Sequence, residues 1–261
     1  MKNNVKPVLV GDVWESNSSG KFEIINNDNM KKVRFRFLVS GYESIAEASK
    51  IRKGQVRDKL KPSICGVGFL GFGEYKSSHR SNHESAHTAW VNMIRRCYDP
   101  YVINKGVSYS DCFVCKEWHN YQNFAEWYHT NYPKDGGDYH IDKDIKNPGN
   151  KEYSPESCIF ASIQVNGFVL DSGSSRGKFL IGASWLDRIG KFQANCNNPF
   201  TRKMDYLGVF VSEIDAHIAW REKKYEHAIN LAKQQGRNEV KHALLNWAQA
   251  LKEFRVHPIE S

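Results

Sequence analysis

The residues best suited to chemistry lie between positions 139 and 158. A histidine, two carboxylates, a lysine and a carboxamide fall close together there, as His140, Asp142, Lys143, Asp144 and Asn150. If residues 139–145 form a strand, the two carboxylates project to the same side, because side chains alternate along a strand. A carboxylate pair suits Mg²⁺ or Mn²⁺, which can polarise a phosphodiester while a neighbouring base assists the attacking water. The pattern therefore predicts a divalent metal site on Asp142 and Asp144.

The same segment also has a purely structural interpretation. Residues 147–150 read Asn-Pro-Gly-Asn, and Asp and Asn side chains commonly hydrogen-bond the backbone of turns. On this interpretation residues 139–158 form a short strand, a Pro-Gly turn and a second short element, and the polar side chains only shape the turn. Spacing alone favours this structural interpretation over the metal site.

Two amphipathic helices are expected before this segment. The first has an apolar stripe at helical spacing, formed by Trp90, Met93, Ile94 and Cys97. The second runs from about Trp118 to Tyr128 and is heavily aromatic, a pattern more typical of a core than of a base-stacking platform. A short strand is predicted at residues 107–114 between them.

The chain has six cysteines and no visible secretion signal, so a disulfide scaffold is not expected. Cys112 and Cys115 form a CxxC pair without a second such pair. Cys97 and Cys158 could complete a structural Zn²⁺ site if the fold brings the four thiols together. The alternative is that Cys97 and Cys158 are buried and Cys112 is incidental.

Residues 1–75 are predicted to form a basic, β-rich module with strands near residues 8–15, 22–25 and 32–37. In the third strand Val33, Phe35 and Phe37 alternate with the cationic residues Lys32, Arg34 and Arg36. The cationic side either follows phosphates or is an ordinary solvated face. A weak helical rhythm follows over residues 42–53, closed by Gly54. The glycine-rich run at residues 66–73 lacks the pattern of a phosphate-binding loop and indicates a linker or a series of tight turns.

A polar joint at residues 172–177 precedes three further strands, at residues 180–185, 191–196 and 204–210. Ser212 is placed to cap a following helix, with Asp215 three residues on. In the second strand the polar residues Lys191, Gln193 and Asn195 alternate with apolar ones, which predicts one hydrogen-bonding face and one face packed on the helix. A last helix after Gly236 either packs on the body of the protein or forms a dimer surface.

The segment from Trp90 to Asn166 resembles phage-encoded HNH-type proteins, which are ββα-metal nucleases. The matching motifs are Trp90-x-x-Met93-x-x-Arg96-Cys97-Tyr98, Val114-Cys115-Lys116-Glu117-Trp118, His140-Ile141-Asp142-Lys143-Asp144-Ile145 and Gly149-Asn150-Lys151 with Tyr153-Ser154-Pro155-Glu156-Ser157-Cys158. The resemblance implies that Asp142 binds the metal and that Asn150 fixes the turn. It departs from the family where the usual general-base histidine falls on Lys143. A lysine is a poor base at neutral pH unless its pKa is depressed, so His140 is the substitute candidate.

Residues 182–220 resemble the AP2 DNA-binding domain. The matching residues are Gly182-x-x-Trp185, Gly190-Lys191-Phe192-x-Ala194, Leu207-Gly208-x-Phe210 and Ala216-x-x-Ala219-Trp220. An HNH module followed by an AP2-like module is an arrangement found in phage homing-type endonucleases. The resemblance implies contact with duplex DNA through Trp185, Arg188, Lys191, Gln193 and Asn195, and Arg176 of the joint is a further candidate.

Composition agrees with a polyanionic partner. The chain has 261 residues, a net charge of +8 and 13% aromatic residues, which favours DNA, RNA or an acidic surface. No apolar run approaches the roughly 20 residues that cross a bilayer, so no membrane partner is expected.

Taken together, these features predict an α+β protein of four parts. These are a β-rich module at 1–75, an HNH-like module at 76–171, an AP2-like module at 172–232 and a helical tail at 233–261. The expected function is a metal-dependent DNA endonuclease acting on double-stranded DNA in the cytoplasm of a bacterial host. The alternative is a catalytically degenerate HNH-like protein that binds DNA or a host protein. The sequence leaves the oligomeric state open.

Overall fold

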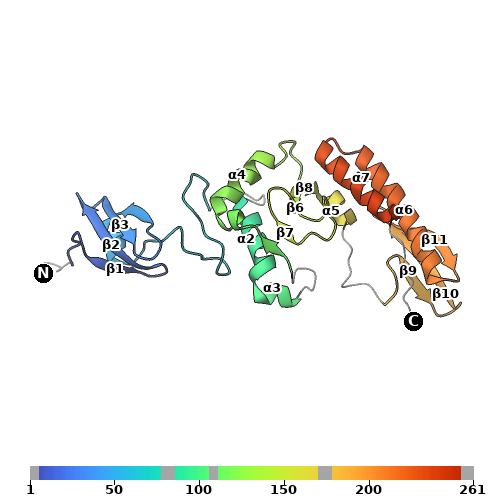
Figure 1. Cartoon of the computed structure of the whole chain (residues 1–261), viewed down its shortest axis with the longest axis horizontal. Helices are drawn as coiled ribbons and strands as arrows, with labels where there is room; N and C mark the ends of the chain where they lie inside the picture. The colour runs from blue at the N-terminus through green and yellow to red at the C-terminus, as the bar shows by residue number, and fades with distance from the viewer. Residues whose placement is uncertain (1–5, 78–85, 106–110, 170–177, 254–261) are drawn as a thin grey trace. The chain divides into compact units, whose positions relative to one another are not determined.

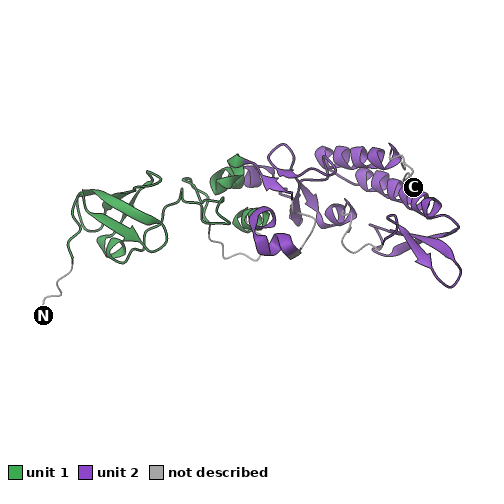
Figure 2. Cartoon of the chain, turned by 60° about the horizontal axis from the view of Figure 1, so that its bottom comes forward, with its two compact units in different colours: residues 1–94, 116–126 green, residues 95–115, 127–261 purple. Residues whose placement is uncertain are grey.

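The computed structural model describes residues 6–77, 86–105, 111–169 and 178–253. The chain divides into two compact units (Figure 2): residues 1–94 with 116–126, and residues 95–115 with 127–261. The predicted α+β class is confirmed. A four-stranded antiparallel sheet comes first, then helices with small two-stranded sheets, then a three-stranded antiparallel sheet and two helices (Figure 1). None of the described helices is long and apolar enough to cross a membrane.

The first sheet is a meander of β1 (Val13–Ser16), β2 (Gly20–Asn27), β3 (Val33–Phe37) and β4 (Glu43–Ala46), followed by α1 (Ala48–Arg52). The predicted alternation in β3 is confirmed, because Val33, Phe35 and Phe37 are buried and the two arginines between them are exposed. The three phenylalanine rings Phe22, Phe35 and Phe37 pack with centroids 5.1 to 5.7 Å apart. This aromatic cluster is the centre of the core of this sheet.

Two local predictions in this module were wrong. The first strand begins at Val13 rather than near residue 8, because residues 9–12 form a turn in which the Leu9 N–H donates to the Asp12 carboxylate. Residues 43–46 form β4 and not a helix, because they pair with β3 along their whole length. The helical rhythm applies only to α1, which ends before Gly54 at φ +62.

The glycine-rich segment is a loop that is fixed by the side chains of Trp90 and Gln122. The side chain of Gln122 donates to the carbonyls of Leu70 and Tyr75 and accepts the Tyr75 N–H. Gly68 lies against the indole of Trp90, where a Cβ would be only 3.0 Å from the ring. The loop therefore owes its shape to side chains that follow it in the sequence.

The first predicted helix is confirmed as α2 (Ala86–Tyr98), and its four stripe residues are all buried. A short α3 (Pro100–Lys105) follows it. Of the strand predicted at 107–114 only β5 (Phe113–Val114) is seen, and residues 106–110 lie outside the described part. The aromatic helix is α4 (Tyr121–Asn131), and Trp118 belongs instead to a preceding 3-10 turn, η2 (Lys116–His119).

The segment around the predicted site consists of short elements in the second unit. Strand β6 (Tyr139–Asp142) pairs antiparallel with β8 (Ile159–Ser162), and α5 (Ile163–Val169) follows and packs on both. Between them β7 (Glu152–Tyr153) pairs in parallel with β5. The order is therefore strand, strand, helix, with an extra short strand inserted.

The C-terminal part consists of β9 (Ala183–Leu186), β10 (Lys191–Asn197), β11 (Met204–Phe210), α6 (Glu213–Lys233) and α7 (Asn238–Glu253). The predicted cap is confirmed, because the Ser212 hydroxyl accepts the N–H groups of Ile214 and Asp215. Gly182 has φ +84, and a Cβ there would collide with Trp220 of α6, so only glycine fits this close approach.

The C-terminal helices share one core with the β6–β8–α5 segment. Ile145, Ile159 and Val165 pack with Leu231 of α6 and Leu244 of α7, and all five are almost fully buried. The buried ammonium of Lys224 donates to the Phe168 carbonyl at 2.7 Å. The predicted joint at 172–177, including Arg176, lies outside the described residues.

Candidate functional site

The two carboxylates of the predicted metal site do not lie on one strand face. Strand β6 ends at Asp142, so Asp144 lies in the turn that follows and not on the same strand. The expectation that alternation aligns them was wrong, because the chain leaves the extended conformation directly after Asp142. The Oδ1 atom of Asp142 accepts the backbone N–H groups of Asp144 and Ile145, both at 2.8 Å. Asp142 is thus the side chain that forms the turn.

Asp142 is also withdrawn from solvent. Only 9% of the residue is exposed, and burial raises its pKa above the ordinary value despite the two N–H bonds, which lower it. A carboxylate that is both buried and committed to the backbone is a poor ligand for a hydrated ion, because Mg²⁺ usually keeps several of its waters.

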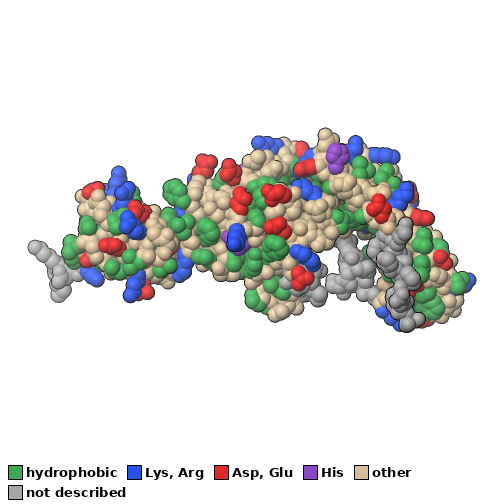
Figure 3. Space-filling model, viewed as in Figure 1, with side chains coloured by type: hydrophobic (Ala, Val, Ile, Leu, Met, Phe, Trp, Pro, Cys, Tyr) green, Lys and Arg blue, Asp and Glu red, His purple; other side chains and the backbone are tan. Residues whose placement is uncertain are grey.

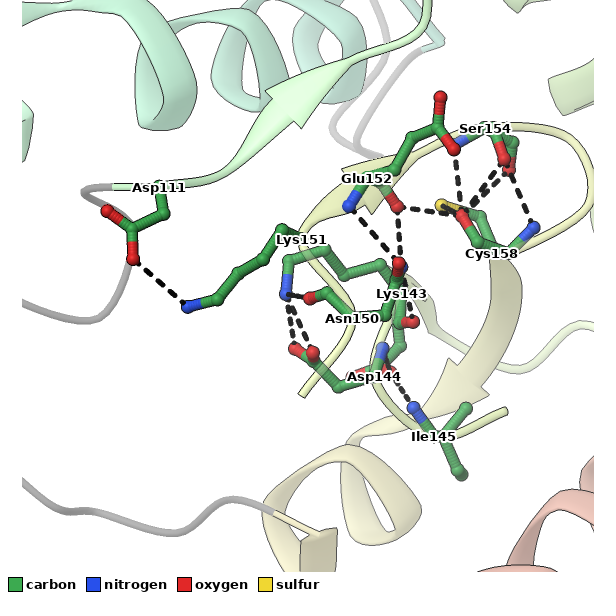
Figure 4. Close-up of polar contacts among 11 residues, drawn as sticks. Asp111, Lys143, Asp144, Ile145, Asn150, Lys151, Glu152, Ser154 and Cys158 are labelled. Carbon is green, nitrogen blue, oxygen red and sulfur yellow. Dashed lines mark hydrogen bonds and ion pairs between the residues drawn. The ribbon is translucent and has the colours of Figure 1, made fainter. Parts of the chain in front are cut away.

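Lys143 contacts the second carboxylate directly (Figure 4). Its ammonium Nζ lies 2.7 and 2.8 Å from the two oxygens of Asp144 and 2.6 Å from the carbonyl oxygen of Asn150. The lysine is only 5% exposed, whereas the Asp144 side chain is 47% exposed. Burial acts to lower the pKa of Lys143, but the bond to Asp144 and its charge outweigh burial and raise the pKa above its ordinary value. Lys143 is therefore held as a cation, the form that has donors and no acceptor for a proton.

Asn150 has the role that the resemblance implies, which is to fix the turn. Its side-chain amide donates to the carbonyls of Lys143 and Glu152, at 3.1 and 2.6 Å, and its oxygen accepts the Glu152 N–H. Ser157 donates to the same Glu152 carbonyl at 2.7 Å. These bonds join the two sides of the loop.

His140 is the most exposed of the predicted catalytic residues. It lies on β6 opposite Ala161 and is exposed. Strand alternation puts it on the side of Asp142, but the Asp142 carboxylate is turned into the loop. The structure thus brings Lys143, Asp144 and Asn150 together and leaves His140 apart from them.

The donor set does not fit a divalent metal. One oxygen of Asp142 is used by two N–H groups, and both oxygens of Asp144 face an ammonium. Across the described ranges, no group of three or more His, Cys, Asp or Glu side chains is placed to hold a metal. The four cysteines proposed for Zn²⁺ are among these residues: Cys97, Cys112 and Cys158 are buried, and Cys115 is half-buried.

The two arginines of the N-terminal sheet lie on a face of mixed charge. Arg36 is opposite Glu43 and Glu23 in the sheet and donates twice to the Glu43 carboxylate, at 2.8 and 2.6 Å. Arg34 is exposed and lies opposite Ile45. Cationic and acidic side chains are interspersed on the view in Figure 3 as well. This arrangement favours the solvated-face interpretation over a phosphate track.

The three-stranded sheet has one face on α6 and one face open. Ala194 and Cys196 of β10 are fully buried against the helix side, as predicted. The pairing of strands then places the following residues on the opposite face: Ser184, Leu186, Lys191, Gln193, Asn195, Asn197, Met204, Tyr206 and Val209. Within these three strands, which are fully described, this open face carries no carboxylate.

The open face is polar at its centre and aromatic at one edge. Gln193 and Asn195 lie side by side, and the Gln193 amide donates to the Asn195 side-chain oxygen at 3.0 Å. Tyr206 and Met204 on β11 are 63% and 62% exposed. Sequence reasoning missed these two, although the alternation in residues 204–210 is a signal that could have found them.

Trp185 lies on the other face. It is opposite Phe192 in the β9–β10 pair, with ring centroids 4.8 Å apart. Arg188 is exposed in the turn between β9 and β10, three residues before Lys191. The structure therefore groups Lys191, Gln193 and Asn195 and separates Trp185 from them.

Comparison of this chain with protein-family models, with curated proteins and with solved structures found no match.

Proposed function

We propose that this protein binds double-stranded DNA through the open face of β9, β10 and β11. The observation that carries the proposal is the composition of that face: a lysine, three carboxamides and an exposed tyrosine on a sheet surface without a carboxylate. Such a face offers hydrogen bonds to base edges and a cation to phosphates.

The geometry of the face agrees with groove binding. β-Ribbons and sheets are known to enter the grooves of DNA, and Asn or Gln side chains can bond adenine in the major groove with two hydrogen bonds. The bond between Gln193 and Asn195 uses one amide hydrogen and one oxygen. The Gln193 oxygen and the Asn195 amide group stay available for a base edge. Lys191 supplies a positive charge on the same face, and Arg188 supplies another in the turn that precedes β10.

The endonuclease is the second candidate. The order β6, β8, α5 is compatible with a ββα module, and His140 is exposed on the first strand. Hydrolysis at this loop would require Asp142 and Asp144 to exchange their present partners for a metal. The proposed function is therefore DNA binding, and metal-dependent cleavage at the loop is the second candidate function.

A selection experiment tests the proposal without knowledge of the target. The full chain is incubated with a pool of randomised duplexes, bound DNA is recovered, and enrichment is measured by sequencing. The wild type is expected to enrich a sequence, and Gln193→Ala with Asn195→Ala is expected to lose enrichment, because each good bidentate contact contributes about 1–3 kcal/mol of discrimination. Gln249→Ala, an exposed glutamine on α7, is the matched control.

Two outcomes oppose the proposal, and a third would add cleavage to it. Equal enrichment by the double variant moves recognition elsewhere on the chain. Stronger competition by structured RNA than by duplex DNA changes the partner. Plasmid cleavage in Mg²⁺ or Mn²⁺ that is abolished by Asp142→Asn favours the endonuclease.

A further inference from the structure

The loop at residues 143–150 already holds a cation of its own. Three oxygens converge on one point: both carboxylate oxygens of Asp144 and the carbonyl oxygen of Asn150. The Lys143 ammonium occupies that point at 2.6 to 2.8 Å from each oxygen. An ammonium has three N–H donors and no acceptor, so these three oxygens satisfy its full donor capacity.

Three contacts fix the lysine in this position. Its own carbonyl accepts the Asn150 side-chain amide at 3.1 Å, so Asn150 holds both the backbone and the ammonium of Lys143. The ammonium lies 5.7 Å from the centre of the Tyr153 ring, over its face. The turn that starts the loop is closed by the two N–H bonds to Asp142. The lysine is therefore a part of the loop's internal bonding (Figure 4).

Electrostatics make the ammonium and a divalent ion mutually exclusive here. A buried ammonium is costly unless an opposite charge pairs with it, and Asp144 supplies that charge at Lys143. A metal bound to the same carboxylate would stand a few ångströms from the ammonium, where like charges repel strongly. It would also leave the buried ammonium without its counter-charge.

We propose that the Lys143 ammonium takes the place of a divalent cation as the charge that closes the 143–150 loop. The loop forms and persists without metal, and Lys143 is a positioning residue that fixes Asp144 and Asn150. This role does not depend on DNA binding by the sheet.

Thermal unfolding of the full chain, with EDTA or with Mg²⁺ or Mn²⁺, tests the role. The wild-type midpoint is expected to be the same in all three solutions. Lys143→Met, which keeps length and removes charge, is expected to lower the midpoint by about 5 °C, a shift that corresponds to one or two kcal/mol in a chain of this size. Lys143→Met combined with Asp144→Asn is expected to recover more than half of that loss, because neither charge is then left unpaired.

Each contrary result overturns the proposal. A metal-induced rise in the wild type that is absent in Asp144→Asn means that a metal displaces the lysine. An unfolding midpoint of Lys143→Met equal to that of the wild type means that the ammonium does not stabilise the loop. A double variant that recovers nothing means that the loss came from packing and not from charge. If Lys143→Met does not fold, calorimetric titration with Mn²⁺ is made on the wild type and on Asp144→Asn, a substitution at a half-exposed side chain. Mn²⁺ binding to the wild type that is lost in Asp144→Asn contradicts the proposal.

Discussion

Trp185 and Phe192 lie directly opposite each other in the β9–β10 pair, with rings inclined at 65° and centroids 4.8 Å apart. Phe192 is on the face that packs against α6, so Trp185 is on that face too. We predict that Trp185→Ala lowers the free energy of unfolding by about 2 kcal/mol, through lost aromatic packing, and leaves duplex affinity within about twofold. Denaturant unfolding and fluorescence anisotropy with duplex DNA measure the two effects.

Tyr206→Ala is the reciprocal control for this prediction. Its side chain is on the open face, so stability is expected to change by less than about 0.5 kcal/mol while duplex affinity falls roughly tenfold. If Trp185→Ala weakens binding and Tyr206→Ala does not, the two faces have been assigned the wrong way round.

Duplex affinity should fall as salt concentration rises. Phosphate neutralisation releases counterions, so the logarithm of the binding constant is linear in the logarithm of salt concentration. Lys191→Gln is expected to reduce the slope by about 1. Arg36→Gln is the matched control, because Arg36 is paired with Glu43, and its slope should equal that of the wild type. A slope change in Arg36→Gln alone would point to the N-terminal sheet instead.

The β11–α6 contact should depend on pH through Asp205. Partial burial acts to raise the pKa of Asp205, but bonds from Asn198 and His227 outweigh it and lower the pKa below the ordinary 3.8. The folded state thus favours the ionised form, so the contribution of Asp205 is complete above pH 3.8 and is lost as pH falls through the folded-state pKa. Asp205→Asn should lower the free energy of unfolding by about 1–2 kcal/mol at pH 7. The difference from the wild type should shrink as pH falls below 3.8. Urea unfolding from pH 7 to pH 3 measures it, and a difference that grows in acid would contradict the assignment.

Thiol labelling separates buried from accessible cysteines. Burial raises the pKa of Cys97 and of Cys158 to about 12 and that of Cys196 to about 11. Because the thiolate is the reactive form, these three should resist maleimide at neutral pH until the protein unfolds. Cys65 and Cys115 are partly exposed and should react first. Protection of Cys115 by added Zn²⁺ would instead support the four-cysteine site.

The periodic parts of the fold could be predicted from the sequence. Alternation identified β3 and β10, and helical spacing identified α2, because burial of one face leaves a regular trace in the residue types. The segment at residues 43–46 could not be assigned in this way. It is short, and only its pairing with β3 makes it a strand.

The candidate site was harder to predict for a different reason. The residue types of Asp142, Lys143 and Asp144 suit either a metal site or a turn, and the outcome depends on where β6 ends. The spacing of residue types in the sequence does not show that β6 ends at Asp142. It also does not show that the Lys143 ammonium bonds Asp144. Similarly, the resemblance grouped Trp185 with Gln193, whereas strand register places them on opposite faces.

Side-chain footprinting measures directly whether duplex DNA covers the open face of β9, β10 and β11. The protein is oxidised by hydroxyl radicals with and without bound duplex DNA, and modification at each residue is measured by mass spectrometry. Met204 and Tyr206 on the open face are predicted to be protected by DNA, while the similarly exposed Tyr101 on α3 and Met30 near the N-terminal sheet stay unchanged. Protection of Met30 or Tyr101 with full oxidation of Met204 and Tyr206 in the DNA-bound protein would contradict DNA binding through the open face.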